Sequence, residues 1–178
     1  MNTKTLLSYC RDMVRRLDIP APYDVNEVCD LMESRRGRPL SVLPMTMPVY
    51  EGSPSGIWIE TEESDYILFQ EKTSRAHQEH IVAHEIGHML LNHRSSPADQ
   101  DEVARLLMPN LDPSLVRTVL ARTSYEALEE QQAEVVASLL PLQAGRARRS
   151  LPTRRAPAGV APLIQHLERS LARGSGRV

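Results

Sequence analysis

The chain has 178 residues, of which 41% are hydrophobic and 25% are charged, and its formal net charge at pH 7 is −2. This composition is typical of a globular domain, and no apolar run approaches the roughly 18 residues of a membrane span, so we expect no membrane segment. The first residues, MNTKTLLSYC, lack the apolar stretch of a secretory signal, and two cysteines do not make a disulfide framework. The cytoplasm is therefore the expected compartment.

Charge and composition predict one domain over residues 1–144, a linker over 145–159, and an amphipathic helix with a tail over 160–178. Residues 145–178 carry eight arginines and one acidic residue, so residues 1–144 carry a net charge of −9 within the total of −2. These arginines stand among Pro, Ala and Gly, with no aromatic residue to stack on bases. We therefore expect no direct binding to nucleic acid. Binding of nucleic acid through the basic tail ranks last among the functions that the sequence suggests.

The expected elements alternate in type along the chain, which predicts an α+β fold. Apolar residues at helical intervals indicate N-terminal helices within residues 1–36, the second capped by Asp24 and reaching about Met32. Residues 39–70 then contain the short runs LSVLPM, GIWIETE and DYILFQ, separated by turn residues, which indicate three strands. The last two runs are expected to form a hairpin, and the whole a short antiparallel three-stranded sheet packed on helices. The strand DYILF is a candidate for pairing with an extended peptide if it lies at an edge.

Helical patterns dominate the rest of the chain. A helix is predicted over residues 74–92, before HRSSPADQ breaks the pattern. Two short helices follow, in PADQDEVARLLM and DPSLVRTVLAR, and then a longer helix over residues 124–140 that ends near Pro141.

Five of the six histidines lie in the run HQEHIVAHEIGHMLLNH. On a helical wheel of about 100° per residue, His84 and His88 lie one turn apart on one face, which is how one helix supplies two ligands to zinc. His77 and His80 share this face further up the axis, and we expect them to be satisfied surface imidazoles. His93 lies opposite, so the wheel places it outside the site.

Glu85 stands between the two candidate ligands, about 100° round the wheel from His84. It is too far round to be a ligand from the same turn, but near enough to reach a water at the metal, so its expected role is that of general base. Gly87 costs about 1 kcal/mol relative to Ala inside a helix, which a close approach of another backbone would explain. The alternative interpretation of the whole motif is a surface helix with satisfied histidines.

A third ligand is expected from a different helix. The HExxHxxGxxH arrangement is excluded because Leu91 and Arg94 stand at its glycine and histidine positions. The run YEALEEQQAEVVASLLP instead places Glu130 and Glu134 one turn apart, bordered by alanines that allow two helices to approach closely. We expect Glu130 to bind the metal and Glu134 to accept a hydrogen bond from a ligand histidine; a solvated acidic face is the alternative for both. Tyr125 is either a hydrogen-bond donor to the oxyanion or a packed aromatic residue.

The segments HIVAHEIGHMLLNH and EEQQAEVVASLLP together resemble the ImmA/IrrE family of metallo-endopeptidases, over about residues 50–141. The resemblance implies a small gluzincin-like metallopeptidase domain with HExxH on a central helix, a Zn²⁺ cofactor, a bacterial or phage origin, and a helix-turn-helix repressor as protein partner. The family's second glutamate is Gln132 here, and its Asn or Asp is Glu134. Because Gln132 points about 200° away from Glu130, the change is harmless if Glu130 is the ligand and weakens the site if the second position is.

Two functions from different classes follow. The first is a zinc-dependent endopeptidase that hydrolyses a peptide bond, with a helix-turn-helix repressor as the expected substrate. The second is a non-proteolytic regulatory or toxin-like protein that retains the metallopeptidase fold and binds a DNA-binding partner, an interpretation suggested by Gln132 and by the basic C-terminal region.

Overall fold

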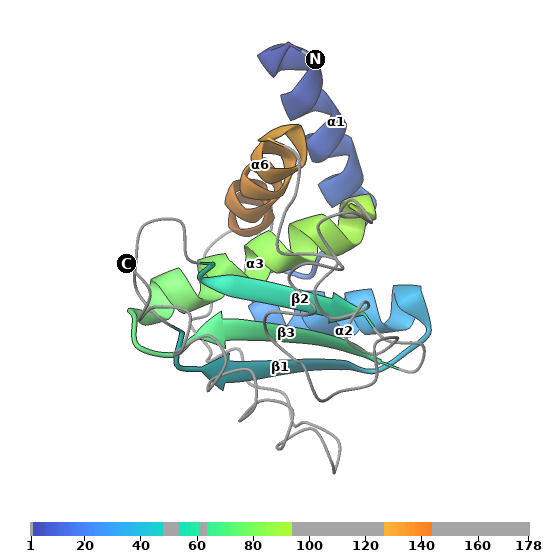
Figure 1. Cartoon of the computed structure of the whole chain (residues 1–178). Coiled ribbons are helices and arrows are strands. Elements are labelled where there is room, and N and C mark those ends of the chain that lie inside the picture. Colours follow the sequence, from blue (N-terminus) through green and yellow to red (C-terminus); the bar gives the residue numbers. More distant parts are fainter. Residues whose placement is uncertain (1, 48–53, 61–63, 94–126, 144–178) are drawn as a thin grey trace, which may run out of the picture.

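A computed structural model describes residues 2–47, 54–60, 64–93 and 127–143 of the protein. These residues form the helices α1 (Thr3–Arg15), α2 (Val25–Arg36), α3 (Arg75–Leu91) and α6 (Ala127–Gln143), and the strands β1 (Leu40–Met45), β2 (Gly56–Glu60) and β3 (Asp65–Gln70). Figure 1 shows α3 between the sheet on one side and α6 and α1 on the other. The mixture of helices with one small sheet confirms the expected α+β class at this coarse level.

The helices α1, α2 and α3 each begin at a side-chain cap. Asn2, Asp24 and Ser74 lie in extended conformation, and their side chains accept hydrogen bonds from backbone N–H groups of the first turns of α1, α2 and α3. The predicted helix over 74–92 therefore agrees with α3 and its two caps. Helix α2 runs one turn beyond the expected end at Met32, to the left-handed Gly37.

The sheet has the order β1-β3-β2 and is mixed, so the expected antiparallel three-stranded sheet is wrong in one pairing. The predicted hairpin is confirmed, because β2 and β3 pair antiparallel with Trp58 opposite Ile67. However, β1 pairs parallel with β3, with Val42 opposite Ile67. The chain reverses direction twice between β1 and β3, and β3 then lies between the other two strands, which makes it parallel to β1.

Helix α3 is the central element of the core. One side packs on β2, β3 and α2, and α6 packs on α3 away from the sheet, with α1 in turn against α6. All six residues of β3 are buried, as is expected for a central strand covered on both faces. The largest side chains that are fully buried include Trp58, Phe69, Met32, Ile86 and Leu140. The core therefore holds α3 rigidly on the sheet side and leaves its other side for α6.

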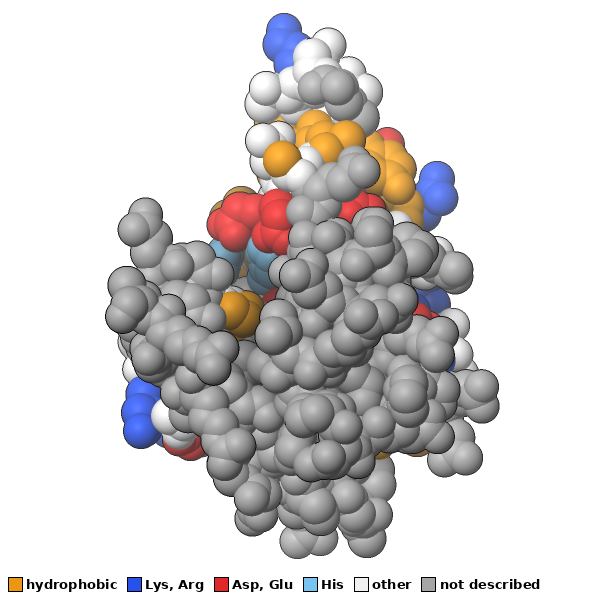
Figure 2. Space-filling model, in the orientation of Figure 1, with side chains coloured by type: hydrophobic (Ala, Val, Ile, Leu, Met, Phe, Trp, Pro, Cys, Tyr) orange, Lys and Arg blue, Asp and Glu red, His pale blue; other side chains and the backbone are white. Residues whose placement is uncertain are grey.

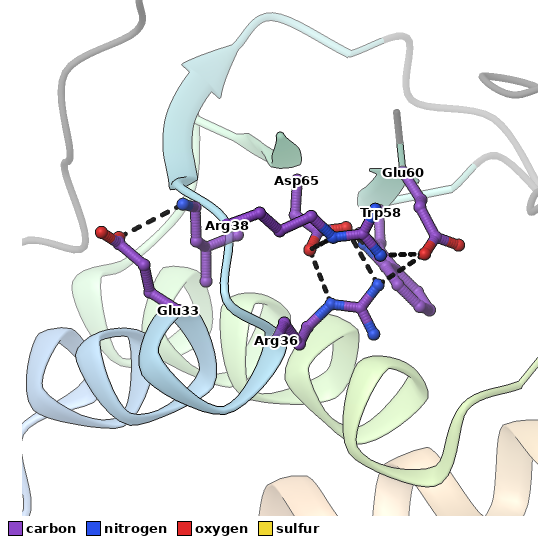
Figure 3. Close-up of polar contacts among 7 residues, drawn as sticks. Glu33, Arg36, Arg38, Trp58, Glu60 and Asp65 are labelled. Atoms are coloured by element: carbon purple, nitrogen blue, oxygen red, sulfur yellow. Dashed lines mark hydrogen bonds and ion pairs between the residues drawn. The ribbon is translucent and has the colours of Figure 1, made fainter. Parts of the chain in front are cut away.

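A group of charged residues joins the end of α2 to the far ends of β2 and β3 (Figure 3). Asp65 is buried and accepts hydrogen bonds from the Arg36 guanidinium, at 2.6 Å from Nε, and from the Trp58 indole N–H at 3.0 Å. Arg38 forms an ion pair with Asp65 at 3.0 Å and a further one with Glu60, and Arg36 also pairs with Glu60 at 2.7 Å. Two guanidinium groups are thus balanced by two carboxylates, which is the arrangement that makes charge tolerable in a partly buried position.

Several predictions lie outside the described residues. These are the two short helices expected before residue 124, the start of the longer helix at 124, the linker over 145–159 and the helix with its tail over 160–178. The described part of the longer helix continues to Gln143, past the predicted end near Pro141. Among the described helices, none is long and apolar enough to cross a membrane.

Candidate metal centre

Two histidines of α3 and one glutamate of α6 bring their ligand atoms together. Nε2 of His84 and Nε2 of His88 lie 3.0 Å apart. The Glu130 carboxylate lies 3.4 Å from Nε2 of His84 through Oε2, and 3.6 Å from Nε2 of His88 through Oε1. These three residues form a group that can hold a metal ion, because one ligand atom from each lies within 4.8 Å of the others.

The distances within this group can be compared with those between the ligands of a tetrahedral metal ion. Zinc binds nitrogen and carboxylate oxygen at about 2.0–2.2 Å, so neighbouring ligand atoms of a tetrahedral site lie about 3.3–3.6 Å apart. Each Glu130 oxygen has one histidine nitrogen at such a distance, Oε2 at 3.4 Å from His84 and Oε1 at 3.6 Å from His88, and the two histidine nitrogens are slightly closer together, at 3.0 Å. His88 is buried, His84 is partly exposed and the side chain of Glu130 is half exposed, so the group opens to one side. Among the described residues, the donor set is therefore two imidazoles and one carboxylate, which can hold a metal ion such as zinc.

The helices α3 and α6 approach closely because small residues face each other. A Cβ atom at Gly87 would lie 2.9 Å from Cα of Ala133 and 3.0 Å from its carbonyl oxygen. Ala133 itself is buried, one turn from Glu130. The expectation that Gly87 marks a close backbone approach is confirmed, and this approach brings the Glu130 carboxylate to the histidines.

Glu85 lies on the side of α3 that faces the sheet. The Glu85 side chain is buried next to Gly56. A Cβ atom added to Gly56 would lie 2.5 Å from Oε1 of Glu85. The backbone N–H of Trp58, two residues along β2, donates a hydrogen bond to the Glu85 carboxylate. Strand β2, which lies at an edge of the described part of the sheet, thus holds the carboxylate that the sequence predicts to be the general base.

Burial and neighbouring charges change the acid–base behaviour of the group. Burial raises the pKa of Glu85 to about 7, while the charge of His84 acts in the opposite direction and the charge of Glu130 in the same direction. For His84, burial lowers the pKa, but the hydrogen bond with Glu130 and the charges of Glu85, Glu130 and Glu134 together raise it above its usual value. The three carboxylates therefore favour a positive charge on His84.

Glu134 lies one turn beyond Glu130 and contacts two histidines of α3. Its Oε2 is 3.5 Å from Nδ1 of His84 and 3.1 Å from Nε2 of His80. The position next to His84 Nδ1 is the one expected of a residue that orients a ligand histidine. His80 therefore has a carboxylate partner, while His77 is exposed and stacks on the His80 ring at 6.5 Å between centroids. Figure 2 shows acidic side chains directly beside histidine side chains on this face.

His93 contacts the site, so its predicted exclusion is wrong. The wheel assumed that the helix continues, but α3 ends at Leu91 and Asn92 adopts a left-handed conformation with φ 53°. This conformation reverses the chain, and the His93 N–H bonds the His88 carbonyl at 3.0 Å. The buried His93 ring then lies with Nδ1 at 2.9 Å from Nδ1 of His88. The signal in the sequence was Asn92, a residue that tolerates the left-handed conformation at a helix end.

Gln132 contacts His93 and lies at the back of the site. Its Oε1 is 2.9 Å from Nε2 of His93. Glu130, by contrast, contacts the Nε2 atoms of His84 and His88. Gln132 therefore lies where the wheel placed it, away from the Glu130 carboxylate, and in contact with a residue that the wheel did not assign to the site. Burial lowers the pKa of His93, and the hydrogen bond with Gln132 opposes this change. Tyr125, the predicted oxyanion donor, lies outside the described residues.

Comparison with protein-family models, with curated proteins and with solved structures gives no match for this chain. The interpretation of the site therefore depends on its own geometry and on the resemblance of its motifs.

Proposed function

We propose that the protein is a zinc-dependent endopeptidase of gluzincin-like fold, in which His84, His88 and Glu130 hold the metal and Glu85 is the general base. The observation that carries this proposal is the convergence of one ligand atom from each of these residues within 4.8 Å, with the Nε2 atoms of the two histidines 3.0 Å apart. Two imidazoles and one carboxylate, with an open fourth position, are a ligand set of catalytic zinc sites. The resemblance to the ImmA/IrrE family supports the same activity and suggests a helix-turn-helix repressor as substrate.

The residues of this chain would divide the reaction between them. When bound, zinc supplies Lewis acidity and makes water a stronger acid. Glu85 takes a proton from the attacking water and transfers it to the leaving amine, and its hydrogen bond from Trp58 keeps the carboxylate in one orientation. Glu134 holds His84 from the side opposite to the metal.

The edge of the sheet next to the site is β2, not the strand DYILF that was the candidate for pairing with a peptide. DYILF is most of β3, and both of its edges are paired, with β1 and β2. In the described part of the sheet β2 is the strand on the side of α3 and Glu85, so it is the strand along which an extended substrate would lie. Backbone pairing along β2 would carry a peptide bond past Glu85.

The test combines metal content with cleavage of a candidate substrate. Purified protein should hold one zinc per chain, and Glu130→Ala should lose it, whereas Glu134→Gln should bind zinc about 10- to 100-fold more weakly. Incubation with a helix-turn-helix repressor encoded beside the gene should give a fragment that is absent with Glu85→Gln, although this variant retains zinc. A protein that holds no zinc contradicts the metal centre. A zinc-loaded protein that leaves the repressor intact in a stable complex supports the non-proteolytic alternative.

A further inference from the structure

A chain of hydrogen bonds runs from the candidate metal centre to α6. Nδ1 of His88 lies 2.9 Å from Nδ1 of His93, and Nε2 of His93 lies 2.9 Å from Oε1 of Gln132. The His88 and His93 rings are buried and meet edge to face at 73°. Glu85, Glu130 and Glu134 take no part in this chain, so it is a second set of contacts to a ligand histidine, on the side away from the other ligands.

The number of protons in this chain determines its direction. A neutral imidazole has one N–H and one lone pair, so a contact between two Nδ1 atoms needs one ring to donate and the other to accept. The amide oxygen of Gln132 only accepts, so Nε2 of His93 carries the proton and Nδ1 of His93 presents a lone pair. His88 must then donate through Nδ1–H. Its Nε2 is left with a lone pair, which points to His84 and Glu130.

The opposite direction would block the site. If the amide of Gln132 were rotated so that its NH₂ group faced His93, Nε2 of His93 would accept and Nδ1 of His93 would donate to His88. Nε2 of His88 would then carry a hydrogen, and it could not bind a metal. The orientation of one amide on α6 therefore determines the form of a ligand on α3.

We propose that His93 and Gln132 are positioning residues that hold His88 in the Nδ1–H form and present its Nε2 lone pair to the metal. This inference rests on the metal centre of the proposed function. It also gives a reason for Gln132, because a glutamine and a glutamate at this position both offer an acceptor oxygen to His93. The residue that departs from the family motif would thus support the metal site instead of weakening it.

The first experiment reads the proton positions directly in the metal-free full chain. The ring nitrogens of the histidines are labelled with ¹⁵N, and long-range ¹H–¹⁵N correlation spectra are recorded at about pH 8, where an ordinary imidazole is neutral. His88 and His93 are assigned with His88→Gln and His93→Phe. We expect His88 in the Nδ1–H form and His93 in the Nε2–H form. An Nε2–H form of His88 would overturn the proposal without any reference to metal binding.

The second experiment compares variants that differ in the acceptor alone. Zinc dissociation constants are measured by chelator competition for Gln132→Leu, which removes the acceptor, and for Gln132→Glu, which keeps it. Gln131→Leu, at an exposed neighbour on the same helix, is the matched control. We expect a 10- to 100-fold weaker affinity for Gln132→Leu and for His93→Phe, and an affinity near that of the wild type for Gln132→Glu and for the control.

The results separate this inference from the proposed function. Equal losses for Gln132→Leu and Gln132→Glu, or no loss for either, would show that Gln132 only packs, and would overturn the proposal. Far-ultraviolet circular dichroism of each metal-free variant, including the two used for the assignment, shows whether its fold is intact. A wild type that binds zinc but cleaves no peptide contradicts the proposed activity and leaves the role of His93 and Gln132 supported.

Discussion

At the scale of single residues, Glu85 depends on a glycine that is distant in sequence. Gly56 lies on β2, and a Cβ atom there would be 2.5 Å from Oε1 of Glu85 and 2.6 Å from Cγ2 of Ile81. Neither neighbour has room to withdraw easily, because both side chains are buried beneath the strand. The absence of a side chain at Gly56 is therefore what allows the Glu85 carboxylate, the proposed general base, to lie against the sheet.

Gly56→Ala should reduce peptide hydrolysis while zinc remains bound. The added methyl group must push the Glu85 carboxylate aside, and a displacement of about 1 Å in an active site can cost about 100-fold in rate. The measurement is kcat/KM on a cleaved repressor, together with the zinc content of the same sample. Ser55→Ala, at the exposed preceding residue, is the control and should have wild-type activity. Unchanged kcat/KM in Gly56→Ala would show that Glu85 is not constrained by β2.

How far the sequence predicts the site is clearest at this scale. The spacing of His84 and His88, and the position of Glu130 on another helix, follow from helical periodicity, because the ligands lie inside regular helices. His93 was misplaced because its position depends on one left-handed residue, Asn92, which ends the periodicity. The contact of Gly56 with Glu85 depends on how a strand and a helix pack, and local patterns in the sequence contain no information about it.

At the scale of elements, the proposed metal centre depends on the distance between α3 and α6. The closest approach is at Gly87 and Ala133, and Glu130 stands on α6 one turn before Ala133. An increase in the distance between the two helix axes would move the carboxylate directly away from the two imidazoles. Metal affinity should therefore report on helix packing.

Gly87→Ala should weaken zinc binding and destabilise the metal-free protein. Alanine favours the helix by about 1 kcal/mol, but overpacking typically costs about 1–3 kcal/mol, and the clash here is with the backbone of Ala133 at 2.9 and 3.0 Å. Because those contacts are with backbone atoms, a second change, Ala133→Gly, should not restore affinity. The zinc dissociation constant and the urea midpoint measure the two effects. A more stable variant with normal affinity would contradict the close approach.

The ion-pair group at the other end of the sheet should affect stability alone. Asp65→Ala removes the acceptor of the Trp58 indole N–H and leaves Arg36 and Arg38 with one carboxylate partner fewer. Breaking a buried charge pair typically costs about 3–5 kcal/mol, which urea unfolding of the metal-free protein would measure. In the sheet, Asp65 lies opposite Glu60, and Glu60 and Gly56 are at the two ends of β2. Because Gly56 is the residue that contacts Glu85, the zinc affinity of the folded variant should be normal. A loss of zinc affinity in the folded variant would show that the two ends of the sheet are coupled.

Strand order also belongs to this scale, and the sequence predicts it only in part. The hairpin of β2 and β3 follows from two short apolar runs that only a few residues separate in the sequence. The place of β1 beside β3, and hence the parallel pairing, depends on contacts between distant residues and on which strand has both faces covered. All six residues of β3 are buried, as in a central strand. In the sequence, the almost continuous apolar character of DYILFQ is the signal that indicates this central position.

At the scale of the whole molecule, the site is connected to the core through α6. Helix α1 packs against α6, and the thiol of the buried Cys10 lies 3.8 Å from the carbonyl oxygen of Gln132, the residue that contacts His93. On the sheet side, α2 packs against α3, and the Tyr23 side chain that precedes it is buried. Loss of either support should release the helices that carry the ligands, so global stability and metal affinity should fall together.

Alkaline pH should destabilise the metal-free protein through these two buried groups. Burial raises the pKa of Cys10 above the ordinary 9.0, and burial, reinforced by the charges of Cys29, Glu79 and Asp24, raises the pKa of Tyr23 far above the ordinary 10.0. Both groups are acids whose neutral form is favoured in the folded state, so the unfolded chain releases these protons first. The stabilisation is fully present well below pH 9 and is lost as the pH rises, with a slope of at most about 1.4 kcal/mol per pH unit for a group between its unfolded and its folded pKa.

The pH dependence can be assigned to Tyr23 with one conservative change. Tyr23→Phe removes the phenol and retains the buried ring, so the free energy of unfolding of this variant should fall less steeply between about pH 10 and pH 11 than that of the wild type. Tyr9→Phe, at a tyrosine that is 43% exposed, is the matched control and should follow the wild type. Urea unfolding followed by circular dichroism at each pH gives the slopes. Equal slopes for the wild type and Tyr23→Phe would mean that the phenol ionises in the folded protein as easily as in the unfolded chain. Such a result would contradict the burial of the Tyr23 side chain beside α2.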